Sequence, residues 1–264
     1  MAFPSSQRVI YQKNPLNQVV CQLRFPPILK IEAELPSVFQ EAVRSDYPLF
    51  SEAQPLNLPF PQDAAKMVRI GLQIKVARQY EFVSADQVWK LSLSKDAIAL
   101  GCSDYKRWEQ FRTRFVGPFE ALVAVYGPSF FQRAGLRYIN LIQRSRLGLT
   151  GVGWNELIQS YIAPEMETQI ANALDDTEHT LIVRLNENSR VRIYHGIARI
   201  ADGAEEGYLI DNDFFTEQRV EVKDVVQRLD TFNRSSGDLF RWCIAERLHR
   251  AMEPTPVESQ APVS

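Results

Sequence analysis

The sequence predicts an α+β protein built on one curved antiparallel sheet, with its helices on one face. Three observations favour this class. Several segments alternate apolar and polar residues with a period of two, which is typical of strands with one buried and one solvent-facing side. The order strand, helix, three strands, helix occurs twice along the chain. A chain of 264 residues with 45% hydrophobic and 23% charged residues also has the composition of an ordinary globular protein.

The first half begins with a strand and a helix. Residues 19–25 alternate between apolar and polar side chains, and the Pro26-Pro27 pair ends the strand. Apolar residues at helical spacing then predict a helix over residues 35–46. Proline and turn-forming residues recur from 47 to 63, which indicates a long irregular loop.

Three further strands complete the sheet of this half. The clearest spans residues 68–82, where apolar residues occupy every second position except at Arg78. A period of two held for this length indicates a strand with one wet face. Two shorter strands follow over residues 88–94 and 97–102, separated by turn residues.

A helix closes the first half. Asp104 is placed as its N-cap, because a short carboxylate side chain accepts hydrogen bonds from the free N–H groups of the first turn. The Gly117-Pro118 pair predicts a kink or a division, since proline removes a helical hydrogen bond. Gly127-Pro128 predicts the end of the helix.

The second half repeats this order of elements with different residues. A strand is expected over residues 130–143, a short helix over 154–162, and then three more strands (residues 180–186, 190–200 and 208–215). The last element is a long helical stretch over residues 222–252, which Ser235-Ser236-Gly237 can interrupt. Residues 254–264 have no apolar anchors and are expected to form a disordered tail.

Either half alone would have a bare sheet edge and a small core. Joining the strands of both halves into one curved sheet, with the helices on one face, solves both problems. We therefore expect a pseudo-duplicated fold, with one α+β half at residues 1–128 and another at residues 129–253. The alternative is a single irregular α+β domain whose halves match by accident.

Charge and cysteine content exclude several classes of protein. Thirty basic and 32 acidic residues give a net charge of -2, which argues against broad binding to a polyanion. The three cysteines (Cys21, Cys102 and Cys243) are too widely spaced for a zinc site or a disulfide framework, as in proteins of the reducing cytoplasm. The sequence shows neither a signal-peptide core at its start nor an apolar run of membrane-spanning length. We expect a cytoplasmic protein with no membrane contact.

The sequence carries no established catalytic, cofactor or metal signature. The glycines of residues 148–153 lack the Lys-Ser/Thr pair of a phosphate loop, and no G-x-S-x-G nucleophile motif occurs. The histidines are not spaced as metal ligands, and His195 is interpreted as a core histidine with a backbone partner. Asp211 and Asp213 are interpreted as a turn entrance that caps the next helix, with a magnesium site or an acid–base pair as alternatives. We expect no catalytic residue, no cofactor and no metal.

The strongest candidate for a binding surface is the sheet face turned away from the helices, which we call the open face. It is expected to carry arginine, lysine, amide and hydroxyl side chains, although the orientation of the strand at residues 130–142 stays open. Such a face could bind a phosphate backbone or nucleotide, or an acidic partner protein; a solvated face with cross-strand polar pairs is the third interpretation. The candidate binding residues are Arg24, Arg69, Lys75, Lys90, Arg133, Arg137, Tyr138, Arg184, Arg192 and Tyr194.

Four segments carry a resemblance to a known family: NPLNQVVCQLRF at residues 14–25, YKRWEQF at 105–111, RAGLRYINLI at 133–142 and LFRWCIAERLHRAME at 239–253. They resemble a sporadically distributed, functionally uncharacterised bacterial family of similar length, for which GLRYIN is the most specific strand motif. A patchy distribution is typical of mobile, defence-related or toxin–antitoxin genes. The resemblance therefore implies an antitoxin-like or defence-associated role.

Three hypotheses of function follow from these observations. The first is a non-enzymatic binding or regulatory protein of a bacterial cell that acts through protein–protein contacts. The second is a nucleic-acid or nucleotide binder that uses a basic sheet face. The third is an enzyme whose site, formed by Asp211, Asp213, Arg133 and Arg137, is assembled only in the fold. A homo-oligomer is compatible with all three.

Overall fold

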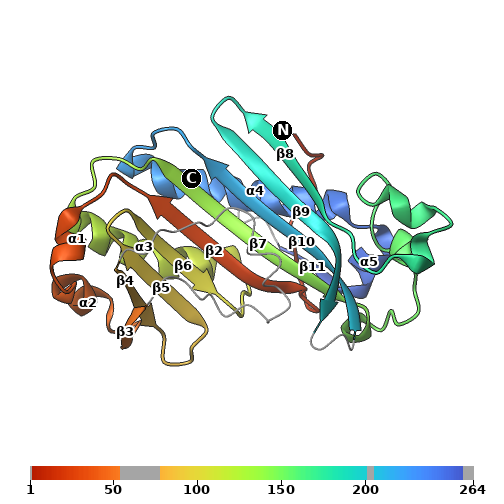
Figure 1. The fold of residues 1–264 in the computed structure, drawn as a ribbon, viewed down its shortest axis with the longest axis horizontal. Coiled ribbons are helices and arrows are strands. Elements are labelled where there is room, and N and C mark those ends of the chain that lie inside the picture. Colours follow the sequence, from red (N-terminus) through yellow and green to blue (C-terminus); the bar gives the residue numbers. More distant parts are fainter. Residues whose placement is uncertain (1, 54–77, 201–204, 258–264) are drawn as a thin grey trace.

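The computed structural model describes residues 2–53, 78–200 and 205–257, and its main feature is one open, curved antiparallel sheet (Figure 1). This sheet has nine strands in the order β3-β4-β5-β6-β2-β7-β10-β9-β8, and β1 and β11 form a separate pair. The strands are β1 Val9–Tyr11, β2 Leu16–Arg24, β3 Leu49–Ala53, β4 Gln79–Val83, β5 Trp89–Ser94, β6 Ala97–Cys102, β7 Arg133–Gln143, β8 His179–Asn186, β9 Ser189–Ile200, β10 Glu205–Thr216 and β11 Pro254–Pro256.

The strand order is the same in the two halves of the chain. In the first half β2 lies beside β6, followed outward by β5 and β4; in the second half β7 lies beside β10, followed by β9 and β8. The strands β2 and β7 pair with each other at the centre, so the two halves share one continuous sheet. The first half has one additional edge strand, β3, where the sequence predicts only an irregular loop.

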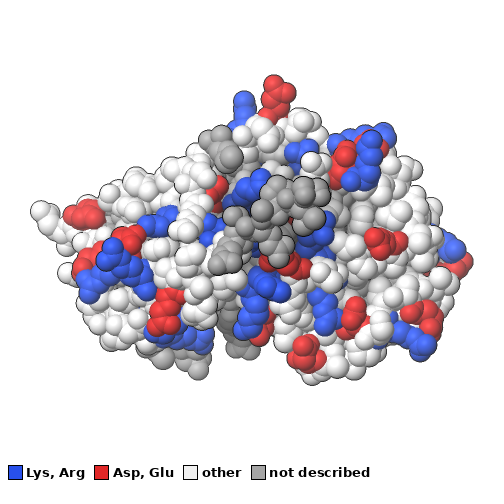
Figure 2. Space-filling view, turned by 180° about the vertical axis from the view of Figure 1, so that it is seen from behind, with Lys and Arg blue, Asp and Glu red and all other residues white. Residues whose placement is uncertain are grey.

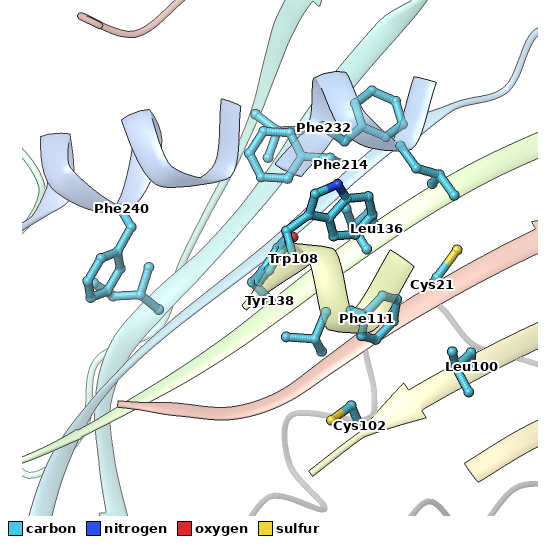
Figure 3. Packing of buried hydrophobic residues seen from close by; sticks show 14 of the residues in the cluster. Cys21, Leu100, Cys102, Trp108, Phe111, Leu136, Tyr138, Phe214, Phe232 and Phe240 are labelled. Carbon is cyan, nitrogen blue, oxygen red and sulfur yellow. The ribbon is translucent and has the colours of Figure 1, made fainter. Parts of the chain in front are cut away.

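The helices pack on one face of this sheet. The long helices are α3 (Trp108–Tyr126) and α4 (Val225–Cys243), and the short ones are α1 (Leu29–Ala33), α2 (Ser37–Val43) and α5 (Glu246–Ala251). Phe111 of α3, Phe232 of α4 and Leu136 of β7 belong to one hydrophobic core (Figure 3). The alternating residues predicted to face this core, such as Cys21 and Leu100, are fully buried. The prediction of an α+β fold on an open antiparallel sheet is confirmed.

The helix α3 differs from its prediction at one end and in its middle. Asp104 is not its N-cap, because the helix begins after Arg107 and no side chain caps it. Pro118 does not divide the helix. Proline has no backbone N–H to donate to the carbonyl of Arg114, four residues earlier. This carbonyl instead accepts a hydrogen bond from the hydroxyl of Tyr47 at 2.9 Å. Gly127 ends the helix in a left-handed conformation with φ of 55°, as the sequence predicts.

Two elements of the second half also differ from their predictions. The short helix expected over residues 154–162 is only a single 3₁₀ turn at Trp154–Glu156. The long C-terminal helix is continuous through residues 235–237 and breaks instead at Ile244, whose backbone forms an isolated bridge with Ile158. The expected disordered tail begins with the ordered strand β11, which pairs with β1.

Part of the predicted long strand lies outside the described residues. Residues 68–77, including the candidate binding residues Arg69 and Lys75, belong to this part of the chain, and the described strand β4 begins at Gln79. None of the helices in the described ranges is long and apolar enough to cross a membrane.

Candidate functional site

The strand register decides which candidate residues share the open face. Arg133 and Arg137 of β7 lie on it, beside Gln22 of β2 and Asp213 of β10. Tyr138 is the next residue along β7 and therefore points to the opposite face, where its hydroxyl donates to Asn233 Oδ1 of α4 at 2.9 Å. Its placement among the open-face candidates is wrong, because neighbouring residues of a strand cannot share a face.

Two arginines of the open face are bound by the two aspartates of β10. Arg133 Nη2 donates to Asp213 Oδ2 at 2.8 Å, and Arg137 Nε donates to Asp211 Oδ1 at 2.8 Å. Both aspartates lie in the interior of β10, so the prediction of a turn entrance that caps a helix is wrong. Burial raises the pKa of the Asp211 carboxyl, against the opposing effect of the Arg137 guanidinium. The four side chains form two cross-strand ion pairs.

Other candidate cations are paired as well. Lys90 Nζ lies 2.5 Å from Glu81 Oε1, and Arg24 Nη2 lies 3.7 Å from Asp96 Oδ2. Figure 2 shows the opposite, helix-covered side of the molecule, and basic and acidic side chains are interspersed there as well. The open face is therefore less basic than the sequence predicts, since acidic residues on neighbouring strands and turns neutralise much of its charge.

Tyr194 lies on the open face but is buried. It packs with Ile139 and Leu209 in a small apolar cluster separate from the main core. Burial raises the pKa of its hydroxyl, and neighbouring acidic side chains raise it further. Its ring serves packing and does not offer a free stacking surface.

The hairpin of β8 and β9 is the part of the open face where cations stay uncompensated. Arg184 of β8 lies directly opposite Arg190 of β9, and Arg192 follows on the same side. None of these three forms an ion pair within 4 Å of another residue in the described ranges, but Arg192 lies directly opposite Asp213 of β10, so only Arg184 and Arg190 lack a nearby acidic residue on the neighbouring strand. Like charges placed opposite each other destabilise a strand pair. A ligand that carries negative charge would relieve this repulsion.

The edge of the same hairpin is apolar and accessible. Among the described residues β8 pairs with β9 alone, so its other side presents backbone N–H and C=O groups. Ile182 is 59% exposed and Leu181 43% exposed, which is unusual for large aliphatic residues of a strand. The β8 edge (Thr180, Leu181, Ile182 and Arg184, with Arg190 and Arg192 of β9) is the first candidate site.

The cysteines and His195 offer no reactive site. All three thiols are buried, which raises the pKa of Cys102 to about 11 and that of Cys243 to about 12. His195 is a core histidine as predicted, but its partner is the hydroxyl of Tyr208 at 2.9 Å and not the backbone. Burial and the stacked His179 ring lower its pKa to about 4. Within the described ranges no cluster of three or more His, Cys, Asp or Glu side chains is arranged to hold a metal ion.

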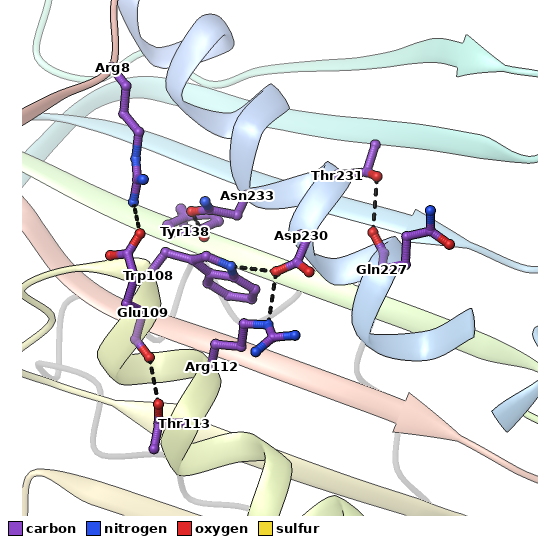
Figure 4. A network of polar contacts seen from close by, with 10 residues as sticks. All are labelled: Arg8, Trp108, Glu109, Arg112, Thr113, Tyr138, Gln227, Asp230, Thr231 and Asn233. Atoms are coloured by element: carbon purple, nitrogen blue, oxygen red, sulfur yellow. Dashed lines mark hydrogen bonds and ion pairs between the residues drawn. The ribbon is translucent and has the colours of Figure 1, made fainter. Parts of the chain in front are cut away.

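A cavity of about 380 Å³ lies on the other face of the sheet, and the sequence pattern does not indicate it. The N-terminal segment, the start of α3 and the middle of α4 form its walls, and β7 and β10 contribute Tyr138, Asn140 and Asn212. Figure 4 shows Trp108 of α3 reaching across to Asp230 of α4, where its Nε1 donates to Oδ1 at 2.7 Å. We call this space the α3–α4 cavity; it is the second candidate site.

The α3–α4 cavity is rich in cations and amides. Its lining has five basic residues (Arg8, Lys106, Arg107, Arg234 and Arg241) and two acidic ones (Asp230 and Asp238). Asn212 is 0% exposed, and neither its Oδ1 nor its Nδ2 has a hydrogen-bond partner. An unsatisfied buried polar group costs about 1–3 kcal/mol, so this asparagine destabilises the fold unless something binds it.

The four residues proposed for an enzyme site are brought together by the fold, but none of them lines the α3–α4 cavity. Arg133, Arg137, Asp211 and Asp213 are adjacent, but each arginine is bound by an aspartate in a regular cross-strand pair. This arrangement is that of structural ion pairs on a sheet.

No protein-family model and no curated protein matches this sequence, so the resemblance carried by GLRYIN stays a prediction.

Proposed function

We propose that this chain is a non-enzymatic binding protein that takes an extended, acidic segment of a partner protein along its β8 edge. The observation that carries the proposal is the coincidence of three features on one hairpin: an edge with one strand neighbour among the described residues, exposed aliphatic side chains, and two arginines (Arg184 and Arg190) that face each other without an ion-pair partner among these residues. Each feature alone is common on protein surfaces. Together they match the requirements of strand addition.

Strand addition explains how each feature would contribute. Backbone groups of the partner segment pair with the free side of β8 and provide affinity with little sequence dependence. Ile182 and Leu181 point to opposite faces of the strand, so the partner gains an apolar contact on each face. Acidic side chains of the segment would lie near Arg184 and Arg190 and relieve their mutual repulsion.

The resemblance described above supports a bacterial regulatory role, antitoxin-like or defence-associated, for such a binding protein. Antitoxins and related regulators act by capturing a protein partner and require no catalytic residues of their own. The buried thiols and the paired arginines and aspartates of the open face are compatible with this role.

A nucleic acid is the second candidate ligand for the same hairpin, because Arg184, Arg190 and Arg192 could bind phosphates. The ion pairs that neutralise Arg133, Arg137 and Lys90 argue against it, since a long nucleic-acid track needs many free cations. Salt dependence separates the two. Contacts to many phosphates weaken steeply with salt, whereas a β8 edge complex that adds backbone and aliphatic contacts to two arginine contacts loses only part of its affinity.

The experiment is quantitative co-purification of the tagged full chain from a bacterial host that carries its gene, at low and high salt, with nuclease treatment. The variants are Ile182→Asp, which puts a charge on the edge, and the Arg184→Glu/Arg190→Glu pair. Ile170→Asp is the matched control, because Ile170 is similarly exposed but lies outside the strands.

We expect a protein partner whose recovery falls about tenfold or more in both β8 variants and is unchanged in the control, since loss of an interface anchor costs at least about 1.4 kcal/mol. Equal recovery with Ile182→Asp would overturn the proposal. So would a captured species that is nuclease-sensitive and released by salt, or a wild-type chain that stays a monomer without any partner at micromolar concentration.

A further inference from the structure

We propose that the α3–α4 cavity binds a nucleotide, with the base against Asn212 and the phosphate at the start of α3. The cavity lies on the helix-covered face of the sheet, away from the β8 edge, so this inference is independent of the proposed function. It is also distinct from nucleotide binding on the open face, which the ion pairs described above do not favour. The contacts of the lining residues carry the inference.

Small residues of α4 form part of the cavity lining. Ser236 and Gly237 occupy the middle of this helix where it passes over β7 and β10, and both line the space. A Cβ added at Gly237 would meet nothing within 4 Å, so the space at this position is open. Phe240, one turn later, also lines the cavity and packs edge-on against Tyr11 of the N-terminal strand. The Ser235-Ser236-Gly237 segment, which could have broken the helix, instead presents Ser236 and Gly237 to the cavity.

Asn212 is the specific feature of the lining. It is fully buried, and its amide oxygen and amide nitrogen both lack a partner, although its neighbour Asn140 donates to the carbonyl of Ile210 at 3.1 Å. A carboxamide presents one acceptor and two donors in a single plane. The edge of a nucleobase offers the complementary pair, and asparagine binds adenine in this bidentate way.

Aromatic rings surround the space above this amide. Tyr105 and Tyr138 meet edge to face with centroids 5.9 Å apart, and Trp108 stacks on Phe111 at 5.8 Å. Figure 3 shows Trp108, Phe111 and Tyr138 close together. Tyr105, Trp108 and Tyr138 all line the cavity. Flat aromatic walls favour a planar ligand, because bases stack on them irrespective of their identity.

The mouth of the cavity suits a phosphate. Lys106, Arg107 and Trp108 stand at the start of α3, a helix of 19 residues whose first turn has no side-chain cap. Its free N–H groups and positive dipole end attract anions. Arg234 of α4 lines the same space, and neither Arg107 nor Arg234 forms an ion pair with any residue in the described ranges.

The remaining charges of the lining are already compensated. Arg8 pairs with Glu109 and Arg241 with Glu246. Asp238 accepts hydrogen bonds from both the backbone N–H and the hydroxyl of Ser6, at 2.8 and 2.9 Å.

Asp230, the other carboxylate of the lining, accepts from Trp108 Nε1 at 2.7 Å and lies 3.2 Å from Arg112 Nε. The guanidinium groups of Arg107 and Arg234 and the N-terminus of α3 therefore stay available for an anion. An uncharged sugar would use the amides but not these groups, and a fatty acid would leave Asn212 unsatisfied. At about 380 Å³ the cavity falls at the small end of the range for small-molecule sites and holds one nucleotide, not an oligonucleotide.

The test is isothermal titration of the full chain with each of the four nucleoside monophosphates, with ATP and with inorganic phosphate. The variants are Asn212→Leu, which keeps the branching and number of side-chain heavy atoms but removes the amide, and Arg234→Gln. Arg228→Gln is the control on the same helix, because Arg228 does not line the cavity. Thermal melting of every variant checks the fold.

We expect saturable binding of at least one nucleoside monophosphate, weakened about tenfold or more by Asn212→Leu and by Arg234→Gln and unchanged by Arg228→Gln. We also expect the unliganded Asn212→Leu protein to melt at a temperature no lower than the wild type, since it loses an unsatisfied amide. A folded wild type with no nucleotide affinity better than about 1 mM would overturn the proposal. Equal binding of inorganic phosphate, or unchanged binding by Asn212→Leu, would also overturn it. The β8 variant Ile182→Asp retains nucleotide binding, so failure of one proposal is distinguishable from failure of the other.

Discussion

The ion pair between Arg137 and Asp211 provides the sharpest test of the structure. Both side chains are largely buried, with 21% and 7% of their areas exposed, and the pair joins β7 to β10 across the open face. Replacing Arg137 by methionine keeps most of the aliphatic stem but leaves the Asp211 carboxylate without its guanidinium. We therefore expect Arg137→Met to be strongly destabilising.

The magnitude follows from the degree of burial. Removing one partner of a buried pair costs about 3–5 kcal/mol, and the partial exposure of Arg137 places the expected loss near the lower end, at about 3 kcal/mol. The loss depends on pH. Without Arg137 the pKa of Asp211, already raised by burial, rises further above its unfolded value. The folded state then binds more protons than the unfolded state, so the free energy of unfolding falls as pH rises above about 4.

Urea denaturation of wild type and variants at pH 5 and pH 8 measures both effects. The double variant Arg137→Met/Asp211→Leu should recover most of the loss, because it leaves no buried charge unpaired. Arg199→Met is the control, since Arg199 and its partner Asp175 are exposed and their pair is worth less than about 1 kcal/mol. A loss below about 1 kcal/mol at pH 8, equal losses at both pH values, or a double variant no more stable than Arg137→Met would refute this reasoning.

Two further predictions concern buried titratable groups. The thiols of Cys21, Cys102 and Cys243 are buried and have raised pKa values, so the native protein should react with a thiol reagent far more slowly than the unfolded protein. A native cysteine that reacts at the rate of the unfolded protein would contradict the structure. His195, with its pKa lowered from 6.5 to about 4, should cost about 2–3 kcal/mol of stability as pH falls from 7 to 4.5, since only the unfolded state gains the proton. Urea denaturation at these two pH values should show this extra loss of stability in the wild type and not in His195→Phe. The same change in the free energy of unfolding for both proteins would exclude the burial of a neutral imidazole.

The alternation of apolar residues was sufficient to predict the core side of most strands. Trp89, Leu91 and Ile98 all face the helices as expected, because burial of one face imposes a period of two on any half-exposed strand. The same signal fails in β7, where both faces are buried. Arg137 and Tyr138 are neighbours there, and only the packing of α4 over Tyr138 determines which of them reaches the open face.

Helix boundaries depended on contacts that are remote in sequence. Pro118 is tolerated in α3 because the hydroxyl of Tyr47, far away along the chain, satisfies the carbonyl that the proline leaves free. The C-terminal helix ends at Ile244 because its backbone pairs with Ile158, whereas the local residues Ser235 to Gly237 favoured an earlier break. Local propensity is a weak preference that such contacts override.

By itself the sequence determined the α+β class, the repeated order of elements and the burial of the cysteines, since these depend on local periodicity and composition. The tertiary structure alone decided the charge of the open face and the existence of the α3–α4 cavity. Arg137 and Asp211 are 74 residues apart and meet only through the register of β7 and β10. Asn212 has no hydrogen-bond partner and lines the cavity together with Ser236 and Gly237 of α4. Both features arise from contacts between segments that are distant in sequence. The periodicity of one segment contains no information about the strand register of another, or about how closely a helix packs over the sheet.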